Sequence, residues 1–198
     1  MYKVGLTGNF YSGYGSITEI FQQKGIPVFD ADVILKFMLN YSQIHIGKIK
    51  EKLGGHVYKL ALLDVNKLDT NEKFDDILDV VQLDLIKAYG KWCKKNSDSH
   101  YTIFKSAILF EREMNKSMDL NISVFKPKNE RRRDITSFTS IPKSTIDAIL
   151  DGEMDEYQKN KKSDYIIHNY SSAYQNDKSG AEVQINCINN SINKKVTI

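Results

Sequence analysis

The chain opens with MYKVGLTGNFYSGYGSI, Met1 to Ile17, and this stretch decides the fold. An apolar run around Val4 and Leu6 is followed by a glycine-rich loop and then by a helical pattern. A strand, a glycine loop and a helix in this order are typical of a phosphate-binding loop. The backbone N–H groups of the turn and the positive end of the helix then converge on one anion. The sequence therefore predicts an anion site near its start.

The loop departs from the usual phosphate-loop motif at two positions. The spacing from Gly8 to Gly13 fits the pattern G-x-x-x-x-G-K-[ST], but Tyr14 and Gly15 stand in place of the lysine and the Ser/Thr. The ammonium group and the magnesium-binding hydroxyl are therefore missing from their usual places. Ser16 comes one residue late and would reach a metal only if the loop changed its register. The Tyr14 ring either stacks on a ligand or fills the space of a phosphate.

Length and composition indicate an ordinary globular protein of one domain. The chain has 198 residues, of which 41% are hydrophobic and 27% charged. A net charge of +3 is too small to indicate nucleic-acid binding. No apolar run approaches the roughly 18 residues of a membrane span, so neither a membrane nor a signal peptide is expected. Cys93 and Cys187 are far apart, which favours a reducing, cytoplasmic setting without disulfides.

Apolar runs alternate with helical patterns along the chain, which predicts a three-layer α/β fold with a parallel sheet. Strands are expected at residues 26–29, 100–105, 120–125 and 163–169. Helices are expected over residues 33–39, 44–53 and 77–92, and from residue 141 towards residue 161. Residues 57–71 look irregular. Beyond residue 171 the chain is polar, and residues 184–188 form either an edge strand or a surface segment.

Charged side chains at predicted strand ends are candidates for chemistry, since open α/β sheets bind their ligands there. Asp30 and Asp32 follow the strand at 26–29; Asp30 is explained equally well as a helix cap, whereas Asp32 is expected to face the cleft. Lys105 is expected beside the loop, where its ammonium group would replace the missing one; the alternative is a solvated strand-end lysine. The histidines His45, His56, His100 and His168 lack metal-ligand spacing, so no metal ligand is assigned.

Several segments, in this order, resemble the dephospho-coenzyme A kinase family of P-loop kinases. They are Gly5-Leu6-Thr7-Gly8 with Ser12-Gly13, Gly25-Ile26-Pro27-Val28-Phe29-Asp30-Ala31-Asp32, Leu63-Asp64, Ala107-Ile108-Leu109-Phe110-Glu111 and Ser163-Asp164-Tyr165-Ile166-Ile167-His168-Asn169. The resemblance implies five parallel strands in a core of residues 1–38 and 98–175. It further implies a helical substrate-binding insert at 39–97, a lid at 126–141 and a polar tail at 172–198.

The family resemblance also implies a reaction, in which ATP with Mg²⁺ phosphorylates the 3′-hydroxyl of dephospho-coenzyme A or a related nucleotide. Asp32 would take the hydroxyl proton, Thr7 and the loop backbone would shape the phosphate site, and Asn169 would lie beside the adenine. The expected catalytic residues are Asp32, Lys105 and Arg133. The expected nucleotide-binding residues are Thr7, Gly8, Asn9, Ser12, Gly13, Tyr14, Gly15, Ser16 and Asn169.

The departures from the family fall on catalytic parts. Arg133 stands where the first lid arginine is expected, but Ser137 stands near the second, and Val65 follows Leu63-Asp64 in place of arginine. Of the basic run Arg131 to Arg133, only Arg133 is therefore expected to contact phosphate, because such runs are commonly solvated helix faces. A catalytically inactive descendant that binds a nucleotide or a protein is the alternative function.

Overall fold

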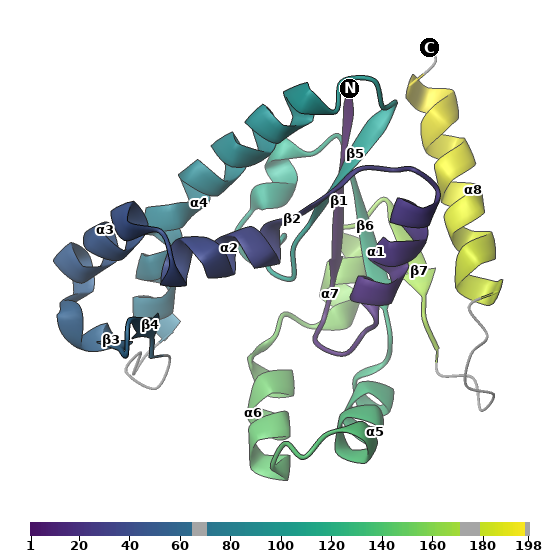
Figure 1. The fold of residues 1–198 in the computed structure, drawn as a ribbon. Helices are drawn as coiled ribbons and strands as arrows, with labels where there is room; N and C mark the ends of the chain where they lie inside the picture. The colour runs from purple at the N-terminus through teal and green to yellow at the C-terminus, as the bar shows by residue number, and fades with distance from the viewer. Residues whose placement is uncertain (65–70, 171–178, 197–198) are drawn as a thin grey trace. The chain divides into compact units, whose positions relative to one another are not determined.

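The computed structural model describes residues 1–64, 71–170 and 179–196 (Figure 1). The chain divides into two compact units, one made of Met1–Phe29 and Asn96–Ile198 and the other of Asp30–Lys95. The first unit contains the glycine loop and nearly all of the main sheet. No helix within the described residues is long and apolar enough to cross a membrane.

The main sheet has five parallel strands in the order β2-β5-β1-β6-β7. Its strands are β1 (Tyr2–Gly8), β2 (Val28–Asp30), β5 (Tyr101–Lys105), β6 (Leu120–Phe125) and β7 (Tyr165–His168). β1 lies at the centre, with Leu6 opposite Lys105 of β5 and Thr7 opposite Ser123 of β6. This order confirms the predicted parallel sheet, and it brings the ends of β5, β6 and β7 beside the glycine loop.

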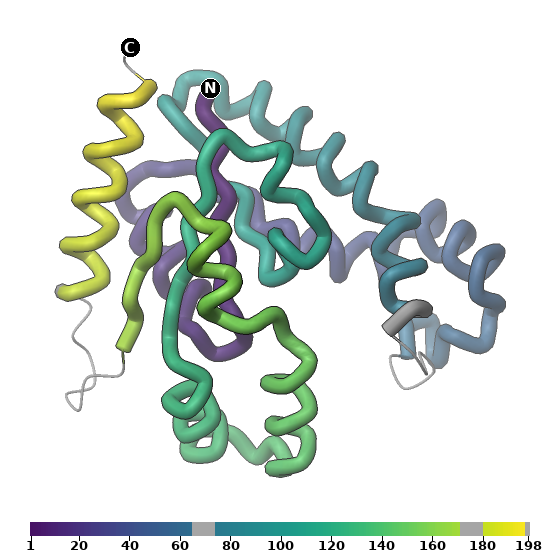
Figure 2. The backbone as a smooth tube through the Cα atoms, turned by 180° about the vertical axis from the view of Figure 1, so that it is seen from behind, coloured from purple at the N-terminus to yellow at the C-terminus, as the bar shows by residue number. Residues whose placement is uncertain are grey.

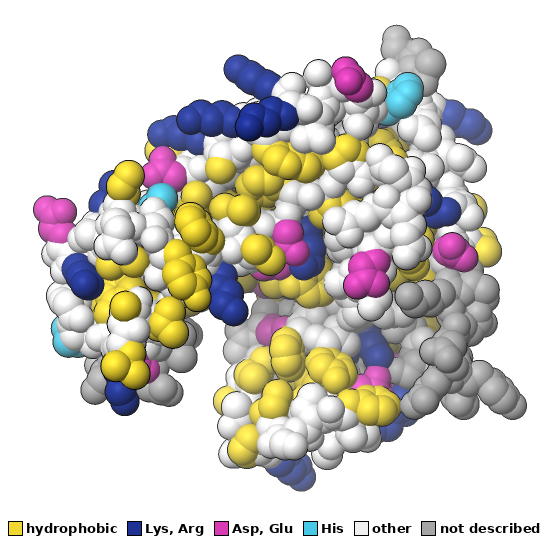
Figure 3. Space-filling model, viewed as in Figure 1, with side chains coloured by type: hydrophobic (Ala, Val, Ile, Leu, Met, Phe, Trp, Pro, Cys, Tyr) yellow, Lys and Arg dark blue, Asp and Glu magenta, His cyan; other side chains and the backbone are white. Residues whose placement is uncertain are grey.

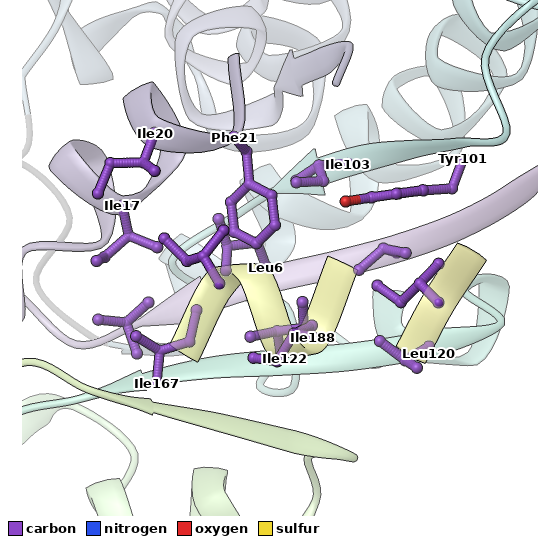
Figure 4. Packing of buried hydrophobic residues seen from close by; sticks show 14 residues of the cluster. Leu6, Ile17, Ile20, Phe21, Tyr101, Ile103, Leu120, Ile122, Ile167 and Ile188 are labelled. Atoms are coloured by element: carbon purple, nitrogen blue, oxygen red, sulfur yellow. The ribbon is translucent and has the colours of Figure 1, made fainter. Parts of the chain in front are cut away.

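One face of the sheet is covered by α1 (Tyr14–Gln23) and α8 (Ser179–Val196). Figure 4 shows Ile17 and Phe21 of α1 and Ile188 of α8 packed over strand residues such as Leu6. The predicted edge strand or surface segment at residues 184–188 is therefore wrong. These residues form part of α8, and its isoleucines Ile185, Ile188 and Ile192 belong to the main core. Residues 171–178 of the predicted polar tail lie outside the described residues.

The other face of β6 is covered by α7 (Glu156–Lys161), and the chain reaches it through α5 (Lys128–Phe138) and α6 (Lys143–Gly152). Figure 2 shows this path from behind. The prediction of a single helix from residue 141 towards 161 is wrong, because α6 ends at Gly152 and α7 begins only at Glu156. The Asp155 carboxylate then caps α7 by accepting the N–H groups of Tyr157 and Gln158. A short 3-10 helix, η3 (Met114–Ser117), precedes β6.

The second unit is mainly helical. Its elements are α2 (Ala31–Asn40), α3 (Gln43–Leu53), the 3-10 helix η1 (Gly55–Val57), β3 (Tyr58–Lys59), β4 (Leu62–Leu63) and α4 (Asn71–Lys95). Residues 58–63 form a small antiparallel hairpin where the sequence looks irregular, and residues 65–70 lie outside the described part. The Tyr58 hydroxyl donates to the Leu39 carbonyl over 2.9 Å, which joins the hairpin to α2.

Candidate functional site

The glycine loop connects β1 to α1 and has the geometry that its sequence predicts. Gly13 is the N-terminal cap residue of α1 and has a φ of 83°, a left-handed conformation that favours glycine. A Cβ atom on Gly8 would lie 2.4 Å from the Ser12 hydroxyl oxygen, and one on Gly13 would lie 2.1 Å from the Asn169 side-chain nitrogen. A side chain at Gly8 would also crowd the Val124 carbonyl at 3.2 Å, whereas one at Gly13 would have to displace the Asn169 amide. The loop turns directly into a helix N-terminus.

Asn169 holds the second half of this loop. Its side-chain Nδ2 donates a hydrogen bond of 2.7 Å to the Ser12 carbonyl, while its backbone N–H donates to the Phe125 carbonyl over 2.9 Å. The residue therefore joins the ends of β6 and β7 to the turn around Gly13. The contact that the structure gives Asn169 is with the loop backbone; its expected place beside an adenine stays a prediction.

Lys105 and Tyr14 come together at the position where the usual loop lysine is missing. Tyr14 begins α1 and packs partly against the main core cluster. The Lys105 ammonium nitrogen lies 5.1 Å from the centroid of the Tyr14 ring, within the range of a cation–π contact. A positive charge from β5 is thus held over the residue that replaces lysine in the motif.

The serine hydroxyls of the loop have different surroundings. Gly15 has no side chain, and Ser16 is exposed on the first turn of α1. The Ser12 hydroxyl is buried beside Gly8 and has no hydrogen-bond partner among the described residues. Within residues 1–64, 71–170 and 179–196, no three His, Cys, Asp or Glu side chains come together as a metal-binding group.

Thr7 shares a hydrogen-bond acceptor with Lys159, which forms an ion pair with Glu111. The Thr7 hydroxyl donates to the Ala107 carbonyl over 3.4 Å, and the Lys159 ammonium donates to the same carbonyl over 2.8 Å. Lys159 also pairs with Glu111 at 2.9 Å, although only 3% of the Lys159 side chain is exposed. The one signal for this pair in the sequence is Glu111 itself, because a carboxylate that follows an apolar run requires a cationic partner when it is buried.

The arginines of α5 have very different surroundings. Arg133 is 62% exposed, and its Nε lies 3.4 Å from an oxygen of the neighbouring Asp134. Arg131, by contrast, is fully buried and contacts the loop, with its Nη1 donating to the Phe10 carbonyl over 2.8 Å. The basic run therefore has one solvated face, as expected, and one buried residue that its local sequence does not indicate.

Asp30 ends β2 and caps α2, and Asp32 follows in the first turn of that helix. The Asp30 carboxylate accepts the Val33 N–H over 3.1 Å and thus caps the helix, which confirms the structural interpretation of this residue. Asp32 lies in the first turn and is partly exposed. Its role as a proton acceptor stays a prediction.

An open aromatic groove of about 540 Å³ lies at the carboxyl ends of β6 and β7. Phe125 lines the groove, and its ring centroid lies 5.4 Å from that of Tyr157. The rings of His168 and Tyr170, which also line it, stack with centroids 5.4 Å apart. Since Asn169 lies between these last two residues in sequence, the groove adjoins the part of the chain that holds the glycine loop.

The chain is similar in sequence to one family of known proteins. Residues 2–175 match the family described as dephospho-CoA kinase. The chain is 24% identical over 176 residues to a dephospho-CoA kinase of Fusobacterium nucleatum, covering 85% of this chain and 90% of that protein. It is 25% identical to the dephospho-CoA kinase of Idiomarina loihiensis, covering 86% and 87% of the two chains.

Solved structures share the fold. The fold is similar to that of a protein from Thermus thermophilus, with a TM-score of 0.77 and 16% identity, over 96% of this chain and 97% of that one. A dephospho-CoA kinase from Campylobacter jejuni aligns with a TM-score of 0.55 and 19% identity, over 97% of both chains. With the family match over residues 2–175, we conclude that this chain belongs to the dephospho-CoA kinase family of P-loop kinases.

Proposed function

We propose that this protein transfers the terminal phosphoryl group of ATP to the 3′-hydroxyl of dephospho-coenzyme A or of a closely related nucleotide. The observation that carries the proposal is the intact backbone of the glycine loop. The tight packing at Gly8 and the left-handed backbone at Gly13 support a loop shaped for a nucleotide phosphate. Membership of the family supports the acceptor and is in keeping with a cytoplasmic enzyme.

Asp32 is our candidate for the proton acceptor. The acceptor hydroxyl oxygen would form a bond to the terminal phosphorus as the bond from that phosphorus to the bridging oxygen breaks and ADP leaves. The hydroxyl proton would pass to the Asp32 carboxylate. In such a transfer most of the rate enhancement comes from aligning the reactants and from neutralising the phosphate charge. One carboxylate is therefore sufficient to accept the proton of the acceptor hydroxyl.

Lys105 and Arg133 are our candidates for the neutralising charges. The Lys105 ammonium lies against Tyr14, which occupies the usual lysine position, and this contact is the support for a relocated lysine. Arg133 is largely solvent-exposed on the lid helix, where its guanidinium is accessible to a phosphate. Mg²⁺ would be held chiefly by the nucleotide phosphates and water, as is common for this ion.

The aromatic groove suits the adenine base, because its lining offers the faces of several rings beside the loop.

The second unit offers the phosphoryl acceptor an exposed hydrophobic surface. Figure 3 shows hydrophobic side chains gathered on it, and Val33, Phe37 and Tyr41 are all exposed along α2. An exposed stripe of this kind fits the methyl and methylene groups in the pantetheine arm of a coenzyme A-like molecule.

The test measures ATP binding by calorimetry and phosphoryl transfer with a coupled ADP assay, using dephospho-coenzyme A and other nucleotides as acceptors. Lys105→Met should lower turnover on the order of 100- to 1000-fold. Lys3→Met, at the opposite end of the neighbouring strand, is the control and should leave turnover unchanged. Adding Tyr14→Lys to Lys105→Met should recover part of the loss.

Two outcomes would contradict the proposal. Turnover that is equal in the wild type and in Lys105→Met would remove Lys105 from the mechanism. ATP binding without transfer to any acceptor, unchanged by Asp32→Asn, would favour an inactive nucleotide-binding protein instead.

A further inference from the structure

Arg131 is buried in a way that demands an explanation. It lies on α5, a helix rich in charged residues, yet none of its side chain is exposed. A guanidinium removed from water is costly unless its N–H groups are paired. Arg131 meets this condition through four acceptors: the carbonyls of Phe10 (2.8 Å) and Lys126 (3.2 Å) and the carboxylates of Glu153 (2.8 Å) and Glu156 (3.5 Å).

Glu153 continues this network into the glycine loop. It follows directly after α6 and only 18% of its side chain is exposed. One carboxylate oxygen accepts the backbone N–H of Phe10, and the other accepts both Arg131 and the Asn9 side-chain amide, the latter over 3.4 Å. The Asn9 amide also donates to the Met154 carbonyl over 2.8 Å. Asn9 and Phe10 are therefore fastened to the segment after α6 by both backbone and side-chain bonds.

Tyr11 adds an apolar contact to the same region. It packs against the small core between α5 and α6, whose buried members are Ile135, Ile146 and Leu150. Its φ of 63° is unusual for a residue other than glycine, so the surrounding contacts hold the backbone in this conformation. The first half of the loop is thus anchored to α5 and α6, whereas Asn169 anchors the second half.

We propose that Arg131 and Glu153 are positioning residues that hold the first half of the glycine loop in its anion-binding conformation. A phosphate loop works only if its backbone N–H groups point at one anion, and here the loop lacks the lysine that would normally bind the phosphate as well. The buried Arg131–Glu153 pair fixes both the N–H and the carbonyl of Phe10. The inference rests on the proposed nucleotide-binding function and adds to it the residues that shape the phosphate site.

The alternative is that the same network only joins α5 and α6 to the sheet. Removing it would then lower the stability of the protein without changing the loop or its affinity for ATP. The two explanations are separated by comparing Arg131→Met and Glu153→Gln with Lys128→Met. Lys128 also lies on α5, but its ammonium group pairs with Asp151 of α6 at 2.6 Å and so tests the helix pair without the loop.

The first measurement needs no nucleotide. Hydrogen–deuterium exchange of peptides covering Asn9 to Tyr11 should become at least tenfold faster in Arg131→Met and Glu153→Gln and stay unchanged in Lys128→Met. Unchanged exchange in both loop variants would overturn the proposal. Glu153→Gln keeps nearly the same shape, so it decides the matter if Arg131→Met does not fold.

The second measurement uses ATP. The Kd and KM for ATP should rise about tenfold in Arg131→Met, while the KM for the acceptor stays the same, and the double variant should be no worse than Arg131→Met alone. Equal changes in both KM values, or a Kd equal to that of the wild type, would overturn the proposal. If the wild type binds no ATP at all, the proposed function fails, and the exchange measurement still decides whether the two residues hold the loop.

Discussion

Replacing Gly13 with alanine should destabilise the protein through two separate effects. The residue has a φ of 83°, so alanine would be placed in the left-handed region at a cost of about 1 kcal/mol. The new Cβ would also lie 2.1 Å from the Asn169 side-chain nitrogen, which is closer than any stable contact. Asn169 would have to move and give up its 2.7 Å bond to the Ser12 carbonyl.

The magnitude follows from adding these effects. Losing the Asn169 bond costs about 1 kcal/mol, so Gly13→Ala should lower the free energy of unfolding by roughly 2 kcal/mol. Gly15 provides a control two positions away. A Cβ there meets nothing within 4 Å and the position lies in the first turn of α1, so Gly15→Ala should stabilise the protein by about 0.5–1 kcal/mol.

The assay is urea unfolding at 25 °C for both single variants, for Asn169→Ala and for the double variant Gly13→Ala/Asn169→Ala. Without the Asn169 side chain there is no clash, so Gly13→Ala should cost about 1 kcal/mol less in that background than in the wild type. If the two substitutions were additive, or if Gly13→Ala and Gly15→Ala had the same sign, the coupling between Gly13 and Asn169 would be refuted.

Three further predictions concern other parts of the chain. Ile185→Ala should lower the free energy of unfolding by about 2–5 kcal/mol, as measured by urea unfolding, because this side chain of α8 is fully buried in the main core; a value under 1 kcal/mol would show that α8 is not part of the core. Tyr157→Leu should weaken ATP binding about fivefold by calorimetry, from a loss of about 1 kcal/mol of ring contact, and should leave binding of inorganic tripolyphosphate unchanged; equal loss for both ligands would remove the base from the aromatic groove. Partial burial raises the pKa of the Asp84 carboxyl, but Lys48, His45 and Lys87 outweigh it and hold that pKa below its ordinary value of 3.8. The carboxylate therefore stabilises the fold above pH 3.8, and the small difference in thermal stability between wild type and Asp84→Asn should fade as the pH falls below that value; a difference that grows in acid would contradict this sign.

The glycine loop and the parallel sheet could be predicted from sequence because their signals are local. Gly8, Gly13 and the apolar residues before them fix strand, turn and helix within one short stretch. The cap at Asp30 is visible for the same reason, since its carboxylate bonds to an N–H three residues later.

The helix at the end of the chain could not be predicted because two periodicities compete there. Ile185, Ile188 and Ile192 repeat as a helical face does, but residues 184–188 also alternate polar and apolar residues, which resembles a strand. The surrounding asparagines and lysines weaken the helical signal further. Packing against α1 and β1 decides between the two patterns, and that contact is not encoded locally.

The buried arginine could not be predicted for a more general reason. Three successive arginines give no local indication of which one turns inward. The partners that make burial of Arg131 tolerable are Glu153, 22 residues later, and the Phe10 carbonyl, 121 residues earlier. Only the folded chain brings these groups together, so the local pattern favours the exposed Arg133 instead.

The placement of α8 has a consequence for how the chain is made. β1 is synthesised well before α8, although Ile185, Ile188 and Ile192 cover the face to which Val4 and Leu6 belong. Until α8 is made, α1 alone covers this face, and an incompletely covered apolar sheet is prone to self-association. Chaperones that shield nascent apolar surface would therefore act on this face until α8 emerges.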